Sequence, residues 1–222
     1  SALIHAATMV TAGIYLVCRT YPLFLIAPES LHLMAWVGGI TAFLAATIGM
    51  AQFDIKRIMA YSTVSQLGYM FLGLGVLTTY GAAFHVFTHA FFKAVLFLTC
   101  GAIMHGFAGQ LDLRKLSGLI RIPGWRVTSI TMLIGTLCLA GFPFTSGFFS
   151  KDAIIAEAFI TQGPGFVFLG ILGSLSPIFN FLNFYVAGQN KRGMKDLTSV
   201  AGNAWRGFAP SAEAIGEFFG FI

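Results

Sequence analysis

The chain has 222 residues, of which 57% are hydrophobic and only 9% are charged, and its mean hydropathy is +0.82. A soluble domain carries about 25% charged residues, so this composition excludes an ordinary soluble enzyme. Lipid is the natural solvent for most of the chain, and we expect no nucleic acid among its partners.

Apolar segments of helical length follow one another along the sequence. Their limits predict helices at 2–19, 31–51, 56–77, 81–105, 126–160 with an interruption, and 166–188. About 20 residues of helix cross a bilayer, and small residues interleaved with Phe, Leu and Ile suit close helix packing in lipid. The sequence predicts an all-α polytopic membrane bundle of about six transmembrane segments in residues 1–188. A polar, interfacial or loosely ordered tail, 189–222, is expected to follow.

The start of the chain lies inside the first apolar pattern. Ser1 is not preceded by an initiator methionine or by the charged region of a signal peptide. This start predicts a fragment or a processed product.

The distribution of basic residues predicts the topology. If the connection at 52–57 lies on one side of the membrane, side X, pairs of crossings return the loop 107–126 and the segment after 188 to that side. The opposite side then has only Arg19. The positive-inside rule makes X the cytoplasmic or matrix side. Side X collects Lys56, Arg57, Arg114, Lys115, Arg121, Arg126, Lys191, Arg192 and Lys195.

The fifth segment is interrupted at its centre by the string Gly141-Phe-Pro-Phe-Thr-Ser-Gly147. Pro143 removes a backbone donor and clashes with the preceding turn. A broken helix is tolerated at membrane depth only where protein or water satisfies its backbone groups. We therefore expect a discontinuous helix that lines an ion path, as in transporters. A loop between two separate short segments is the alternative.

Three titratable residues, His85, His89 and Lys93, recur every four positions in the fourth segment. This spacing places them on one face of a helix. Insertion scales assign a central lysine a cost of about 2.5–3.5 kcal/mol, so ionisable residues inside a membrane are functional candidates. Single structural hydrogen bonds to neighbouring helices are the alternative, but three groups in register favour a proton relay.

Lys151 is a second candidate because it follows the helix break directly. Asp152 is adjacent and Glu157 lies about a turn and a half further on. Together these residues predict a lysine–carboxylate pair beside the break.

His5 and Lys56 leave two interpretations each. His5 either extends the relay from the first segment or is a core histidine bonded to a backbone carbonyl. Lys56 follows Asp54, a candidate N-cap, and its periodicity alone indicates an interface charge that reaches toward water.

Cofactor sites find no support in the motifs. His85 and His89 lie on successive turns of one helix and cannot both bind one haem iron axially, and His105 lies near the membrane edge. The sequence contains no HExxH, no GxGxxG after a strand, no P-loop and no CxxC pair. We expect free thiols at the three cysteines, Cys18, Cys100 and Cys138, and no metal or cofactor site.

Five strings in the first 160 residues carry a family resemblance. They are SALIHAATMVTAGIYL (Ser1–Leu16), DIKRIMAYSTVSQLGYM (Asp54–Met70), FHVFTHAFFKAVLFL (Phe84–Leu98), LDLRKLSGL (Leu111–Leu119) and GFPFTSGFFSKDAI (Gly141–Ile154). In this order they resemble the largest antiporter-like membrane subunits of respiratory complex I, the proton-pumping NADH:quinone oxidoreductase. The chain resembles the second half of such an antiporter-like module.

The resemblance implies a central polar axis of Lys56, His85, His89, Lys93 and Lys151, with His5 where two half-channels join. It changes the interpretation of Lys56 from an interface charge to a relay member. It also implies that the proton leaves near Lys151, on the side opposite X. NADH, FMN, iron–sulfur clusters and quinone are expected in partner subunits, and none of them in this chain.

The family pattern also extends beyond this sequence. Further helices before Ser1 carry a glutamate and a lysine that match no residue here, and the match fades after about Ile160. We expect a partner chain or region to supply this N-terminal half, with other membrane-arm subunits as neighbours. The expected location is the mitochondrial inner membrane or the bacterial cytoplasmic membrane.

Two other functions remain open. One is a subunit of a multisubunit cation/proton antiporter, and the other is a non-conducting structural piece of the membrane arm. Thr11 favours the complex I branch, because the antiporter branch tends to have a lysine at that position.

Overall fold

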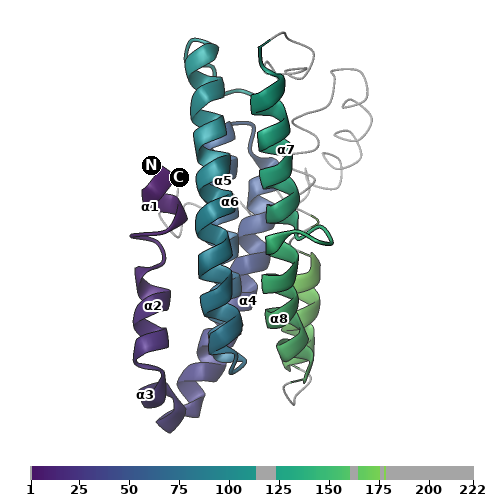
Figure 1. The fold of residues 1–222 in the computed structure, drawn as a ribbon. Coiled ribbons are helices and arrows are strands. Elements are labelled where there is room, and N and C mark those ends of the chain that lie inside the picture. Colours follow the sequence, from purple (N-terminus) through teal and green to yellow (C-terminus); the bar gives the residue numbers. More distant parts are fainter. Residues whose placement is uncertain (1, 114–123, 161–164, 176–177, 179–222) are drawn as a thin grey trace.

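Three long antiparallel helices form the centre of the molecule, α4 (Pro28–Ala51), α5 (Ile55–Gly75) and α6 (Thr79–Gly106) (Figure 1). The computed structural model describes residues 2–113, 124–160, 165–175 and 178. Within these residues, α4 and α6 are long and apolar enough to cross a membrane. The 21 residues of α5, at about 1.5 Å each, also match the thickness of a bilayer core. The predicted all-α bundle is confirmed.

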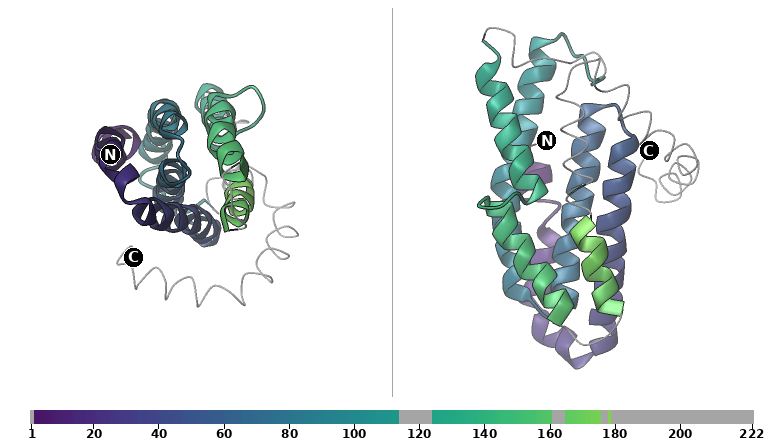
Figure 2. Two further views of the ribbon diagram at one scale, coloured as in Figure 1. Left: turned by 90° about the horizontal axis from the view of Figure 1, so that it is seen from below. Right: turned by 90° about the vertical axis from the view of Figure 1, so that its right-hand side faces the viewer.

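Shorter helices flank this centre on two sides. Figure 2 shows α1 (Ala2–Ala6), α2 (Ala12–Arg19) and α3 (Tyr21–Ile26) on one side and α7 (Arg126–Ala140) and α8 (Ser146–Ile160) on the other. Both α1 and α8 contact α5 and α6, and α7 contacts α6. Helices that lie far apart in the sequence therefore pack against the same helix, α6.

Glycines bring α4 and α5 into backbone contact. A Cβ atom at Gly68 would lie 2.5 Å from the backbone nitrogen of Ala42, and one at Gly38 would lie 2.5 Å from that of Leu72. Such distances leave no room for a side chain, so only glycine allows this approach. The interface is the close packing that the interleaved small residues predict.

The break in the fifth segment is confirmed. Helix α7 ends at Ala140, and the Gly141 that caps it has a φ of +68°, the left-handed conformation that terminates helices. Helix α8 begins at Ser146, so 141–145 interrupts two half-helices that follow one another along the bundle (Figure 1). A further helix, Gly165–Leu175, follows α8. The rest of the predicted helix to 188 and the tail 189–222 lie outside the described residues, as do Arg114, Lys115 and Arg121.

The prediction of one continuous helix at 2–19 is wrong. The chain leaves the helical path after Ala6 and resumes it at Ala12. Threonine hydroxyls within the break take up carbonyls, because Thr11 Oγ1 donates to Ala7 O at 2.8 Å and Thr8 Oγ1 donates to Leu3 O at 3.0 Å. Such side-chain bonds compete with the helical pattern, so the bundle contains a second interrupted segment.

The two connections assigned to side X lie at the same end of the bundle. Asp54 and Asp112 form an isolated antiparallel bridge, in which Ile55 N donates to Leu111 O at 3.1 Å and Leu113 N donates to Phe53 O at 3.0 Å. Asp54 caps α5, accepting from Lys56 N at 2.7 Å. The predicted arrangement of the 52–57 connection and the segment after α6 is therefore confirmed.

Candidate functional site

His85, His89 and Lys93 form a fully buried row on α6. The opposite face of the same helix carries exposed aromatic residues, Phe87 and Phe91, at 62% and 63% exposure. A helix with such an apolar outer face turns its polar face into the bundle. The predicted stripe is thus a real feature of the structure, and α5, α1 and α8 supply its partners.

Lys93 is held by α5. Its Nζ donates to the hydroxyl of Ser62 at 2.6 Å and to the carbonyl of Met59 at 3.1 Å. The ring of Phe97 lies 5.8 Å from Nζ, within the range of a cation–π contact. These oxygen acceptors and the ring satisfy an amine without any carboxylate.

His89 faces the first helix break. Its Nδ1 lies 3.0 Å from the carbonyl oxygen of Ala6, the last residue of α1. Its Nε2 is buried and has no partner within the described part of the chain. Since a carbonyl oxygen only accepts, Nδ1 carries the proton in this contact.

His85 joins α5 to the second half-helix. Its Nδ1 lies 2.8 Å from Ser150 Oγ on α8, and its Nε2 lies 3.0 Å from Gln66 Oε1 on α5. Thr88 Oγ1, one turn along α6, donates to Ser150 Oγ at 3.0 Å. The two imidazoles of the row are adjacent, with ring centroids of His85 and His89 6.2 Å apart.

Lys151 extends the row onto α8. Its side chain is 2% exposed, its Nζ donates to the carbonyl of Leu139 near the end of α7, and the ring of Tyr69 lies 5.5 Å from Nζ. The predicted pair with Asp152 is not formed, because the Asp152 side chain is exposed while the Lys151 side chain turns into the bundle. Glu157 is partly buried one and a half turns further along α8. Consecutive residues on a helix point about 100° apart, which explains the separation of Lys151 and Asp152.

Each helix break supplies an acceptor to this row. The first break offers the Ala6 carbonyl to His89, and the second offers the Leu139 carbonyl to Lys151. Carbonyls at the end of a helix lack intrahelical partners. Pro143 lies in the second break, and both breaks reach the row through backbone carbonyl oxygens.

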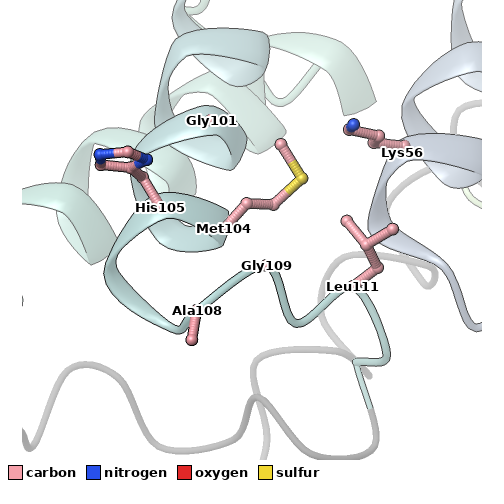
Figure 3. Close-up of a pocket in the computed structure, with 7 residues that line it drawn as sticks. All are labelled: Lys56, Gly101, Met104, His105, Ala108, Gly109 and Leu111. Carbon is pink, nitrogen blue, oxygen red and sulfur yellow. The ribbon is translucent and has the colours of Figure 1, made fainter.

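His5 and Lys56 lie outside the fully buried row. The half-buried ring of His5 stacks on Phe97 at 5.2 Å, the same ring that lies beside Lys93. Lys56 is exposed at the side X end of α5, three residues before Met59. It lines an open cavity of about 460 Å³ together with Met104, His105 and neighbouring residues of the segment after α6 (Figure 3). Lys56 is thus exposed beside this cavity and is not one of the buried residues of the row.

The described residues include no buried carboxylate. Each acidic side chain in the described part of the chain is exposed or partly exposed; these are Glu29, Asp54, Asp112, Asp152 and Glu157. The same part contains no group of three or more His, Cys, Asp and Glu residues that could hold a metal ion. The cysteines Cys18, Cys100 and Cys138 are free thiols. The arrangement is therefore a chain of amines, imidazoles, hydroxyls and an amide, all of which exchange or hydrogen-bond protons.

The sequence relates this site to a known family. Residues 1–176 match the family described as NADH:quinone oxidoreductase/Mrp antiporter, TM. The chain belongs to this family. The resemblance drawn from the five sequence strings is confirmed.

Relatives and a solved structure agree with this membership. The chain is 48% identical over 179 residues to NADH-ubiquinone oxidoreductase chain 5 of Cryptococcus neoformans var. grubii, covering 81% of this chain and 27% of the relative. It is 49% identical over 203 residues to NADH-quinone oxidoreductase subunit L of Rhodobacter capsulatus, covering 83% of this chain and 28% of the relative. A chain of the Mrp complex from Dietzia sp. DQ12-45-1b superposes with a TM-score of 0.72 at 33% identity, over 82% of this chain and 20% of that chain. The chain spans about a quarter of the length of these curated relatives.

Sequence reasoning missed the polar residues that face the row from its neighbours. Ser62, Gln66 and Tyr69 lie on one face of α5 at positions i, i+4 and i+7, and Ser150 precedes Lys151 on α8. The spacing of these three α5 residues is visible in the sequence, because polar residues that recur at the helical period predict a second polar face.

Proposed function

We propose that this chain translocates protons through the buried row of α6 and α8, as part of the membrane arm of a quinone-reducing respiratory complex. The observation that carries the proposal is the burial of His85, His89, Lys93 and Lys151 in hydrogen-bonded contact with hydroxyl, amide and carbonyl groups. Membrane proteins keep such residues for ion pathways and proton relays. The membership of the antiporter family supports the same role.

In this proposal, the amines and imidazoles carry protons and the neutral groups hold them in place. Lys93 takes a proton while Ser62 and the Met59 carbonyl accept from its ammonium. His89 and His85 continue the row toward Ser150, where α8 carries it to Lys151. The gap between His89 and His85, with ring centroids 6.2 Å apart, is of a size that bridging water spans in proteins.

Both ends of the row have a role in the proposal. The cavity beside Lys56 and His105 gives the α5–α6 end access to water on side X. Lys151 is the terminal carrier, from which the proton leaves toward the opposite side, and His5 faces the half of the module that lies outside this sequence. NADH, FMN, iron–sulfur clusters and quinone are bound by partner subunits, and quinone reduction there drives the relay.

The test compares proton pumping with quinone reduction in closed vesicles that contain the assembled complex. Lys93→Met and Lys151→Met remove the charge and keep most of the side-chain volume. We expect both variants to reduce quinone and to pump fewer protons per quinone. Arg57→Met is the matched control, because Arg57 is an exposed basic residue at the side X end of α5. Unchanged pumping in the assembled Lys93 and Lys151 variants would rule out the relay and leave the structural role.

A cation/proton antiporter subunit is the second candidate, favoured by the likeness to a chain of the Mrp complex. Purification of the chain with its natural partners separates the two functions. Copurification with iron–sulfur and quinone-reducing subunits supports the respiratory complex. Copurification with small membrane subunits alone, together with sodium-driven proton exchange in vesicles, supports the antiporter.

A further inference from the structure

Gln66 is a buried amide directly beside a member of the row. It is 0% exposed on α5, and its Oε1 lies 3.0 Å from Nε2 of His85. Its own Nε2 is buried and has no partner within the described part of the chain. A primary amide has an acceptor oxygen on one side and a nitrogen with two donor hydrogens on the other. A half-turn of the Gln66 amide therefore replaces the acceptor that faces His85 Nε2 with a donor.

With Oε1 toward the ring, His85 can hold either one or two protons. Nε2–H donates to Gln66 Oε1, and a bare Nδ1 accepts from the Ser150 hydroxyl 2.8 Å away. When Nδ1 also takes a proton, it donates to Ser150 Oγ, whose own hydrogen can turn to the Ser146 carbonyl at 3.2 Å. Every hydrogen of the imidazolium then has an acceptor.

With the amide nitrogen toward the ring, only the neutral form fits. The amide N–H donates to a bare Nε2, and Nδ1–H donates to Ser150 Oγ. A second ring proton would then place two donors against each other at about 3 Å, which leaves buried donors unpaired at a large cost. The orientation of one amide therefore decides whether the ring can become charged.

We propose that Gln66 is a positioning residue that gates the second protonation of His85 through the orientation of its amide. The inference rests on the proposed relay and adds a control point to it. In the outward step, His85 gives its Nδ1 proton to Ser150 Oγ, and the hydroxyl gives its own hydrogen to the neutral amine of Lys151: the Nδ1–H bond breaks, an N–H bond of Lys151 forms, and Ser150 keeps one hydrogen. The half-turn of Gln66 brings its amide N–H against Nε2 of His85, so it is possible only while Nε2 carries no proton.

Two substitutions at Gln66 separate this gate from simple packing. Gln66→Glu keeps the shape and presents only acceptor oxygens, so it holds the ring in its charged form. Gln66→Leu removes both acceptor and donors. Gln52→Glu and Gln52→Leu are the controls, because Gln52 ends α4 away from the row. Each variant is made in the full chain, and pumping per quinone reduced is measured in vesicles across a range of pH.

The two variants have different expected profiles. Gln66→Leu should lower pumping about tenfold at every pH, the order expected from loss of one hydrogen bond to a buried group. Gln66→Glu should lower the maximum and move the alkaline limb upward by about one pH unit, because an adjacent carboxylate stabilises the imidazolium. In a His85→Asn background, Gln66→Glu should cause no further shift, since the group that it acts on is gone.

Two results would overturn the gate. One is wild-type pumping in both Gln66 variants, and the other is an equal loss in both with an unshifted pH profile, which is the signature of packing alone. If Gln66→Leu does not assemble, Gln66→Glu decides, because the carboxylate has the shape of the amide. Loss of pumping in Lys93→Met together with normal Gln66 variants refutes the gate and spares the relay. Normal pumping in Lys93→Met refutes the relay itself.

Discussion

The two helix breaks each present a backbone carbonyl to a buried titratable residue, but different residues interrupt the helix in each. The second break, at 141–145, contains a glycine in the left-handed region and a proline, and it offers the Leu139 carbonyl to Lys151. The first break, at 7–11, contains neither residue, and it offers the Ala6 carbonyl to His89. A membrane helix can thus be opened toward a buried titratable group either by backbone constraint or by hydroxyl competition. The comparison can be tested by weakening each break in turn.

The largest effect is expected where the two halves of the second break meet. A Cβ atom at Gly147 would overlap the carbonyl oxygen of Cys138, so Gly147→Ala forces α7 and α8 apart. We expect a loss of about 1–3 kcal/mol, as for other overpacked sites. The measurement is the midpoint of thermal denaturation of the purified complex. Gly101→Ala on α6 is the control, because nothing lies within 4 Å of its added Cβ, and its midpoint should not fall.

The first break should respond to loss of a single hydroxyl. Thr11 is buried, and its Oγ1 donates to Ala7 O at 2.8 Å and lies 3.2 Å from Thr8 O. Thr11→Val should reduce the unfolding free energy by about 1 kcal/mol, the typical value of a hydrogen bond, and should lower proton pumping because the Ala6 carbonyl loses its position beside His89. Thr20→Val removes a comparable hydroxyl bond to Leu16 O at an exposed site. Equal pumping by the two variants would contradict the role given to the first break.

A smaller effect is expected from Pro143→Ala. Gly141 terminates α7 by itself with φ at +68°, so the break should persist without the proline. We expect stability to change by less than about 1 kcal/mol, mainly through greater freedom of the unfolded chain, and pumping to stay near that of the wild type. A strong loss of pumping in an assembled complex would show that the proline, rather than the glycine cap, holds the second break open.

The smallest effect should come from Asp152→Asn. The carboxylate is exposed, whereas its neighbour Lys151 is buried against the Leu139 carbonyl. Exposed substitutions of this kind usually stay within about 0.5 kcal/mol, and we expect normal pumping and normal stability. Loss of pumping comparable to that of Lys151→Met would restore the lysine–carboxylate pair that the sequence alone predicts.

The same contrast explains what could be predicted from the sequence. Pro143 and the flanking glycines interrupt a helix by backbone geometry, which is a local property and is visible in the string itself. The row of His85, His89 and Lys93 follows from spacing along one helix. The break after Ala6 depends on threonine hydroxyls that can equally well remain inside a helix, so tertiary contacts with α6 decide the outcome.

Partners across helices could not be predicted in the same way. The sequence predicts a carboxylate partner for Lys151, yet Lys151 bonds to a carbonyl on α7, because the side-chain directions on α8 separate residues 151 and 152. Gln66 bonds to His85 from 19 positions away, and no periodicity within either helix specifies that meeting. Spacing predicts which residues share a face, and only the packing of faces decides which atoms meet.

The glycine contacts between α4 and α5 bear on how fast the site can work. Gly38 and Gly68 bring the backbones of α4 and α5 into direct contact. Helix α5 in turn presents Ser62, Gln66 and the Met59 carbonyl to the row. Because α5 is packed tightly against α4, we expect rearrangement on this side of the row to be confined to rotations of hydroxyls, amides and amine chains. Such rotations require no shift of a whole helix, a motion that takes roughly microseconds to milliseconds. The rate of proton transfer along α5 would then depend on local side-chain rotation. Slower changes in that rate would come from movements of the interrupted segments, α1–α2 and α7–α8.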